Sequence, residues 1–356
     1  MKFSKSLFLA FAGLGLFACS NEDVTEGGAQ GNANVSITVK QMTLGSRNSE
    51  AGINDGTQAT VKTMDVILTA GGTHKKTLTS VTSPQTITFE KVGVPTALEV
   101  SVNDGDESLV LTNDIIKGGA AAPMWVKATG TAESEGEANK IYKADEQNYK
   151  IAATPAFQVA RLELSGIQYQ TTGLGEDGTV PAYTDVKLIG VYLNNVLKSI
   201  GGEKCSVKGE SAWSEMTANT WGPSSSNLEI YDKIEEASEG AAIDEGTPYP
   251  TDGSVIAYNF IPSDKAENVV LVLSAKPWGE ETSVTYYAKV ETYKQSGGNA
   301  ITQFNPGSVY SIKSMKITDE AITTDPEAPK NITVEATVTI SNWTVVNTEI
   351  GWEDQE

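Results

Sequence analysis

The chain has only two cysteines and one histidine among its 356 residues. Zinc and related sites take most of their ligands from cysteine and histidine, so this count excludes a Cys/His metal cluster, and we expect neither a metal nor a cofactor. The single histidine, His74, follows two glycines and precedes two lysines. This composition indicates a solvated turn between strands rather than a catalytic position. A Ser-His-Asp triad would depend on His74 alone, so we expect that the protein is not an enzyme.

Positive charge and long apolar runs are also scarce. The chain carries 26 basic and 46 acidic residues, which gives a net charge of −20 and a pI near 4.5. Such a surface repels nucleic acid and anionic lipid, so neither is expected as a partner. The apolar run near the start, residues 7–17, is shorter than the about 20 residues that a membrane-spanning helix needs.

The first residues have the order of an export signal. Lys2 and Lys5 precede the apolar run, and small residues then lead to Cys19. This order predicts a lipoprotein signal peptide over residues 1–18, with lipid on the Cys19 sulfur; the alternative is a plain signal peptide with an incidental cysteine. Lipidation would leave Cys205 without a partner in the chain, so the fold must depend on its core. The polar, acidic stretch after Cys19 has the composition of a tether.

The rest of the chain reads as strands. Many segments alternate apolar and polar residues, and others, such as residues 269–273, are continuously apolar and fit strands buried on both faces. Turn signals recur between them, and no long amphipathic helix is present in the pattern. We therefore predict an all-β protein with two β-sandwiches, the usual number of domains for this length. The polar stretch 130–148 and the new apolar segment at 159–164 place the N-terminal sandwich at 48–158 and the C-terminal sandwich at 159–322.

A strand predicted near the start differs from an ordinary interior strand. Its apolar residues alternate and then change phase, which implies a β-bulge near Lys40 and Gln41. The apolar residues of this candidate removable strand are Val35, Ile37, Val39, Met42 and Leu44.

A candidate protease site follows this strand. Residues 45–52 are small and polar, which is typical of an exposed segment, and Arg47 is the only arginine before Arg161. Cleavage between Arg47 and Asn48 by an arginine-specific protease would separate residues 19–47 from the remainder.

The C-terminal segment is the second unusual region. Residues 323–330 are polar and contain proline, as in an extended linker. A long alternating strand follows, and its phase also changes near the end. From the pattern alone it is equally well the last strand of its own sandwich or a strand that reaches another molecule. The candidate donor residues are Ile332, Val334, Ala336, Val338, Ile340, Trp343 and Val345.

The order of these features resembles the fimbrillins, the lipoprotein-derived pilins of gut and oral anaerobes (type V pili). The resemblance covers nearly the whole chain but departs from the family between residues 198 and 252. It is carried by the order of the segments: the lipobox, 35–39, Arg47, Pro123-Met124, 159–164, 188–196, 305–312 and Trp343.

The resemblance implies a function and a mechanism. The precursor would be an outer-membrane lipoprotein, held in the membrane only by the lipid on Cys19, and would fold as two tandem transthyretin-like β-sandwiches. Cleavage at Arg47 would release the exchangeable N-terminal strand, and residues 323–356 of another copy, a linker and donor strand, would replace it. The product would be a head-to-tail adhesive fimbrium on the cell surface. The implied partners are other copies of the chain, anchor and tip subunits, the protease, and host or bacterial surface receptors.

Three alternatives come from other classes. A lipid-anchored glycan-binding protein would use Trp213 and Trp221 as a stacking platform, although loop tryptophans more often pin a loop to its sandwich. An anchor or tip subunit of a pilus would lack either the cleavage arginine or the donor tail. Paired carboxylates at Asp104 and Asp106 could serve a glycosidase. Their Asn-Asp-Gly-Asp context instead indicates a turn, or at most a loose cation site.

Overall fold

In the computed structural model, the described residues are 24–26, 31–39, 61–79, 81, 85–119, 121–171, 180–205, 230–234, 240–244, 246–290, 292–295, 299–325 and 336–342. These residues form strands almost throughout, with one four-residue helix, α1 (Asn113–Ile116), and one 3-10 turn, η1 (Asp319–Ala321). The prediction of an all-β protein is confirmed. None of the described helices is long and apolar enough to cross a membrane.

Strands β1 to β10, the N-terminal body, form two sheets. Sheet A has the order β1-β4-β3-β6-β7-β10, and sheet B has the order β5-β2-β9-β8. The side chains that enclose the core alternate along the strands, as a sheet with one buried face requires. The bounds are β1 (Val24–Glu26), β2 (Ala33–Val39), β3 (Met64–Ala70), β4 (Thr73–Leu78), β5 (Gln85–Val92), β6 (Pro95–Val102), β7 (Met124–Thr129), β8 (Ile141–Lys143), β9 (Asn148–Ala153) and β10 (Ala156–Phe157).

Strands β11 to β25, the C-terminal body, form two larger sheets and a two-stranded ribbon of β14 and β15. Sheet C has the order β18-β11-β23-β25-β21-β22, with β12 also paired to β23, and sheet D has the order β16-β13-β19-β20-β24, with β17 paired to β13. The bounds are β11 (Ala160–Leu164), β12 (Ile167–Gln170), β13 (Tyr183–Asn194), β14 (Val196–Leu197), β15 (Lys204–Cys205), β16 (Ile230–Lys233), β17 (Ala241–Ala242), β18 (Ile256–Phe260), β19 (Asn268–Pro277), β20 (Val284–Val290), β21 (Tyr293–Gln295), β22 (Ala300–Ile301), β23 (Ser308–Thr318), β24 (Ile322–Thr323) and β25 (Ala336–Asn342).

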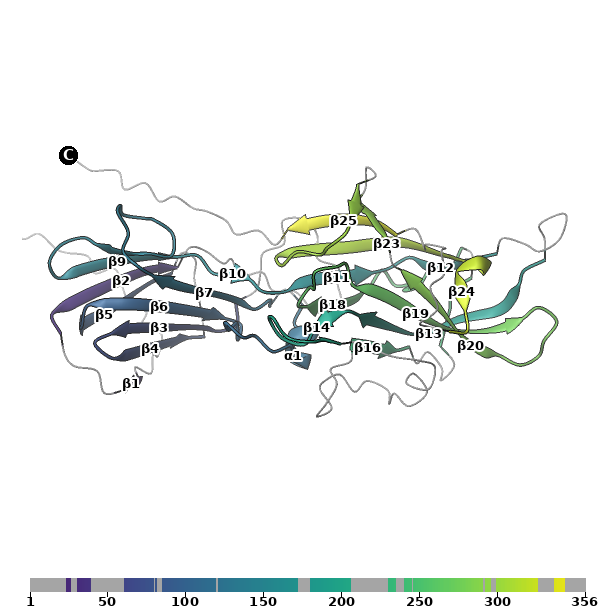
Figure 1. Ribbon diagram of the computed structural model, residues 1–356. Helices are drawn as coiled ribbons and strands as arrows, with labels where there is room; N and C mark the ends of the chain where they lie inside the picture. Colours follow the sequence, from purple (N-terminus) through teal and green to yellow (C-terminus); the bar gives the residue numbers. More distant parts are fainter. Residues whose placement is uncertain are drawn as a thin grey trace, which may run out of the picture.

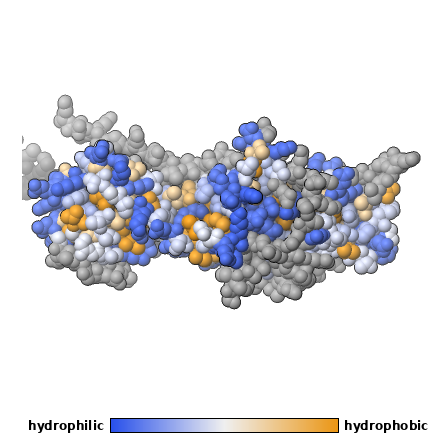
Figure 2. Space-filling view, viewed as in Figure 1, coloured by the Kyte–Doolittle hydropathy of each residue, from blue (hydrophilic) through white to orange (hydrophobic). Residues whose placement is uncertain are grey.

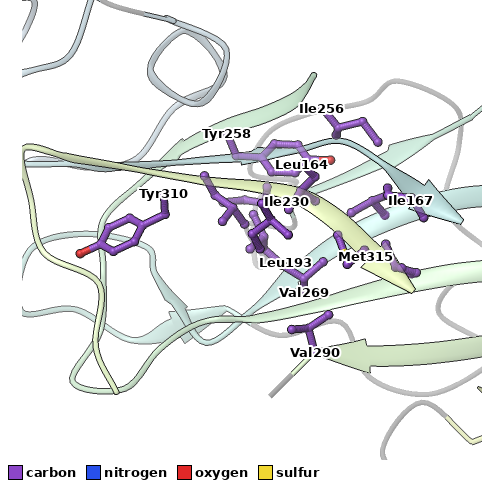
Figure 3. Packing of buried hydrophobic residues seen from close by; sticks show 14 of the residues in the cluster. Leu164, Ile167, Leu193, Ile230, Ile256, Tyr258, Val269, Val290, Tyr310 and Met315 are labelled. Carbon is purple, nitrogen blue, oxygen red and sulfur yellow. The ribbon is translucent and has the colours of Figure 1, made fainter. Parts of the chain in front are cut away.

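Each body has its own hydrophobic cluster, and the larger one fills the C-terminal body (Figure 3). Residues 269–273 of β19 are all buried, as the continuous apolar run predicts. Their two faces contact different clusters. Val269, Leu271 and Leu273 point into the large core, whereas Val270 and Val272 belong to a small third cluster together with tyrosines of neighbouring strands.

The two bodies lie in line and share a junction (Figure 1). The segment that contains α1 leaves the N-terminal body after β6, and its apolar residues, such as Leu111 and Ile116, belong to the C-terminal core. The Leu111 amide donates to the Lys198 carbonyl at 2.8 Å, and the Asn259 side chain donates to the Gly119 carbonyl at 2.9 Å. Because this segment packs into the core of the other body, it resists bending of one body against the other. The domain limits proposed from the sequence remain a prediction.

The prediction for His74 is wrong. His74 lies in β4 rather than in a turn, is only 8% exposed, and has its Nε2 atom 3.2 Å from the Ala70 carbonyl oxygen. The turn is formed by the two glycines before it. His74 is one of the inward residues of the strand, beside the Phe89 ring.

The acidic turn at Asp104 and Asp106 is explained by its own hydrogen bonds. Asn103 and Asp104 have positive φ angles of 50° and 62°. The carboxylate of Asp106 accepts hydrogen bonds from the backbone amide and the hydroxyl of Ser108, which lower the pKa of Asp106. Across the described part of the chain, no group of three or more His, Cys, Asp or Glu residues could hold a metal ion.

Most of the described surface is hydrophilic on the face in Figure 2, with small separate hydrophobic spots. The exposed large apolar residues are scattered over both bodies and do not form one broad patch of the kind that usually marks a flat protein interface. They are Val94, Val110, Ile200, Trp278 and Val284.

One buried acid in the C-terminal body has an unusual environment. Glu267 is fully buried; its Oε1 atom accepts a hydrogen bond from the Ser263 amide, and its Oε2 atom has no partner among the described residues. Burial disfavours the charged form and raises the pKa of Glu267 from 4.5 to about 7.

This pKa predicts a pH dependence of stability. Between pH 4.5 and 7 the folded protein keeps a proton on Glu267 that the unfolded chain loses, so the free energy of unfolding falls as the pH rises through this window. The contribution of Glu267 to the fall is about 3 kcal/mol, from about 1.4 kcal/mol per pKa unit. Glu267→Gln keeps an oxygen for the Ser263 amide but cannot ionise. Denaturant unfolding of the two proteins should therefore show a flatter profile for the variant between pH 5 and 7. Parallel profiles would contradict the raised pKa.

Candidate strand-exchange site

The predicted removable strand is an interior strand of sheet B. β2 pairs antiparallel with β5 and parallel with β9, so both of its backbone edges are hydrogen-bonded. Ile37, next to its central residue, lies opposite Ile87 on one side and Ile151 on the other. If β2 were absent, β5 would have no neighbour in sheet B, and the sheet would be open between β5 and β9.

The apolar side chains of β2 form part of the N-terminal core. Val35 and Ile37 are fully buried, and Val39 and Ala33 are 2% and 6% exposed. The alternate residues, from Asn34 to Thr38, are only half-buried. The alternation therefore matches the prediction, and the loss of β2 would remove a row of side chains from the core as well as two hydrogen-bonded ladders.

The start of β2 is held by specific contacts. The Gly31 amide donates to the Lys91 carbonyl at 3.1 Å, and a Cβ atom on Gly31 would lie 2.2 Å from the Val92 carbonyl oxygen, so the chain enters the sheet where only glycine fits. The Asn34 amide donates to the Gln147 carbonyl at 2.7 Å, and its side chain donates to Asn148 at 3.3 Å. These contacts fix the register of β2.

The predicted donor strand lies in its own body. β25 occupies an interior position of sheet C, parallel to β21 and antiparallel to β23. The interpretation that it is the last strand of its own sandwich therefore describes this state of the chain. Three predicted donor residues, Ala336, Val338 and Ile340, are in β25, whereas Ile332, Val334, Trp343 and Val345 lie outside the described residues.

The two strands match in length, in the kind of neighbours and at three of the four buried positions of β2; at the fourth, Val39 of β2 corresponds to Asn342 of β25. Each has seven residues, and each lies between one parallel and one antiparallel neighbour. Their sequences, ANVSITV for β2 and ATVTISN for β25, have the same apolar residue at three alternate positions. These pairs are Ala33 and Ala336, Val35 and Val338, and Ile37 and Ile340. The sequence prediction treated both strands as similar but missed this identity, which a direct comparison of the two segments reveals.

Several predicted site residues lie outside the described part of the chain. They are the lipidation residue Cys19, the cleavage pair Arg47 and Asn48, the removable-strand residues Met42 and Leu44, and the alternative platform residues Trp213 and Trp221. Their roles remain predictions.

No protein-family model and no curated protein matches the chain. Among solved structures, a fimbrilin from Porphyromonas gingivalis W83 is similar over 90% of this chain and 99% of its own length, with a TM-score of 0.50 and 15% identity. A candidate cell adhesion protein from Bacteroides eggerthii is similar over 90% of this chain and 98% of its own, with a TM-score of 0.50 and 14% identity. At this identity the likeness concerns the fold alone. The chain therefore has the all-β fold of a fimbrilin, as the resemblance in its sequence predicts.

Proposed function

We propose that the protein is a structural pilin, a shaft subunit that polymerises by strand exchange after proteolysis. Cleavage between Arg47 and Asn48 releases residues 19–47, including β2. The slot between β5 and β9 is then filled by the β25 segment of another copy. The observation that carries the proposal is the correspondence of β2 and β25 in length, in neighbouring strands and in three apolar residues.

The positions of the two strands give the polymer a direction. β24, after which the tail begins, is at the end of the C-terminal body far from β2 (Figure 1). β2 runs from the outer end of the N-terminal body toward the junction, where Val39 lies beside Ala153. A tail that extends from β24 would therefore meet the slot at the opposite end of the next copy. Because the two surfaces differ, the contact is head-to-tail and continues as a filament.

The free energy of exchange is the difference between the contacts that β25 gains in the slot and the two ladders that it gives up in sheet C. Each large apolar side chain that refills the slot contributes roughly 1.5 to 3 kcal/mol. Each ladder hydrogen bond adds about 1 kcal/mol. Association costs an estimated 4 to 15 kcal/mol, so two ladders together with the apolar row are needed for a stable joint.

The fold and the names of the similar structures are consistent with this role. One is a fimbrilin and the other a candidate cell adhesion protein, which supports a pilin on the cell surface. The remaining parts of the proposal rest on the sequence: the lipid on Cys19 before cleavage, the arginine-specific protease, the anchor and tip subunits, and surface receptors as partners.

The first test concerns processing at Arg47. Arg47→Ala should leave an uncleaved, lipidated monomer, because the protease lacks its recognition residue, whereas Ser46→Ala should be processed normally. N-terminal sequencing and intact mass of protein sheared from cells measure the outcome. The unmodified protein should start at Asn48, carry no lipid and give a ladder of boiling-sensitive oligomers. A start at lipidated Cys19 with monomers only would favour an anchor subunit or a glycan-binding surface lipoprotein.

The second test concerns the donor strand. Deletion from Asn331 onward should give cleaved subunits that do not polymerise, because nothing refills the slot. Ile340→Asp should also block polymerisation, since it places a charge where Ile37 was buried, whereas Thr339→Asp occupies the position of half-buried Ser36 and should polymerise nearly as the unmodified protein does. Filaments from the tail-deleted protein, seen by electron microscopy, would show that this segment is not the donor.

A further inference from the structure

The segment before Arg47 contributes a second strand, and it lies on the other sheet. β1 pairs antiparallel with β4, with Val24 opposite Lys75 and Glu26 opposite Thr73. Without β1, β4 is the edge of sheet A. The cleavage proposed above would release β1 together with β2, so it would open two places on the N-terminal body: the slot in sheet B and the backbone edge of β4.

The edge of β4 is basic in a strongly acidic protein. Its sequence, THKKTL, contains no acid, whereas the chain has a net charge of −20. Lys75 is partly exposed and forms an ion pair with Asp65 at 2.8 Å, and the Lys76 ammonium lies 5.4 Å from the centre of the Phe89 ring. Lysines on an edge strand discourage unspecific pairing with strands of other molecules. The strand that covers this edge in the precursor comes from an acidic sequence, Glu22-Asp23-Val24-Thr25-Glu26.

The donor tail ends in a segment with the same character. Residues 348–356, TEIGWEDQE, contain four acidic residues and no basic residue. They follow the segment that would refill the slot, so each copy that donates a strand also brings an acidic segment to the same N-terminal body.

The strand directions allow the tail to reach the edge. β2 runs antiparallel to β5, which turns tightly into β6, and the chain of antiparallel pairs from β6 through β3 to β4 makes β2 and β4 roughly parallel. β1 therefore runs opposite to β2. A tail that fills the slot in the direction of β2 and then reverses would run along β4 in the direction of β1. In the precursor the six residues 27–32 join β1 to β2, and the five residues 343–347 would form a link of similar length at the other end of the two strands.

We propose that residues 348–356 of the donor copy replace β1 on the edge of β4. The donor tail then restores both strands that processing removes: β25 takes the place of β2 in sheet B, and the acidic segment takes the place of β1 in sheet A. The inference rests on the proposed function, since it applies only to a copy cleaved at Arg47 and joined through the slot. The acidic segment on the edge of β4 would add a second, charge-selective contact between neighbouring copies.

The test measures the lifetime of oligomers assembled from protease-processed protein. Truncation after Asn347 leaves the slot-filling strand intact and should shorten the lifetime about tenfold at low salt, by loss of ladder hydrogen bonds and ion pairs. Lys75→Glu with Lys76→Glu should have a similar effect, and the neutral pair Lys75→Gln with Lys76→Gln a smaller one. Lys140→Glu with Lys143→Glu, at the β8 edge of sheet B, is the matched control and should leave the lifetime unchanged.

Combining the changes separates a shared contact from two independent effects. Truncation after Asn347 combined with Lys75→Glu and Lys76→Glu should shorten the oligomer lifetime no more than either change alone, because both remove the same contact. A donor with lysine in place of Glu349, Glu353 and Asp354 should restore the oligomer lifetime when the acceptor carries Lys75→Glu and Lys76→Glu, because opposite charges again face each other. Melting of the uncleaved precursors checks that each variant is folded.

Unchanged lifetimes, or effects that add in full, would overturn this inference while leaving the proposed function intact. The proposed function fails separately, if the protein deleted from Asn331 still polymerises.

Discussion

The structure depends on the interior position of β2. A strand at the edge of a sheet can be lost at the cost of one ladder, but β2 carries two ladders and a row of fully buried side chains. Its removal would leave β5 without a partner in sheet B and open the core to water. A cleaved N-terminal body is therefore incomplete until another strand enters, so in the proposed mechanism assembly and the completion of folding are the same event.

The position of β25 decides how many hydrogen-bonded ladders are lost and gained when it moves to another copy. In the precursor β2 fills the slot in one body and β25 is paired in the other. A move of β25 to another copy would have to displace the β2 of that copy, so four ladders would be lost for two gained. Only the removal of β2 creates a vacancy. On this argument, proteolysis supplies the driving force for polymerisation, and an uncleaved chain remains monomeric even when its tail has the correct sequence.

The sequence predicts the parts of this site that depend on local alternation. The burial of Val35, Ile37 and Val39 follows from period-two patterning, which is a property of single strands. Which strands flank β2 depends on contacts far apart in the chain, so the pairing with β5 and β9 could not be read from the segment itself. The sequence places His74 in a turn because Lys76, two residues on, also occupies an inward position of β4 and hides the alternation of His74 and Leu78. The segment with α1 is likewise assigned by sequence to one body, although its apolar residues pack into the other.

The direction of β2 relative to the line through the two bodies determines how a joint in its place would resist force. β2 lies along the line that joins the two bodies (Figure 1). A donor strand in the same place would be pulled along its own length when the filament is under tension. Force in this direction loads all hydrogen bonds of both ladders together, whereas force across the strand would break them one after another. The junction carries part of the same load, because Phe157 packs against both cores and the α1 segment is bonded to the C-terminal body, so side contacts as well as the connecting chain hold the two bodies together under tension.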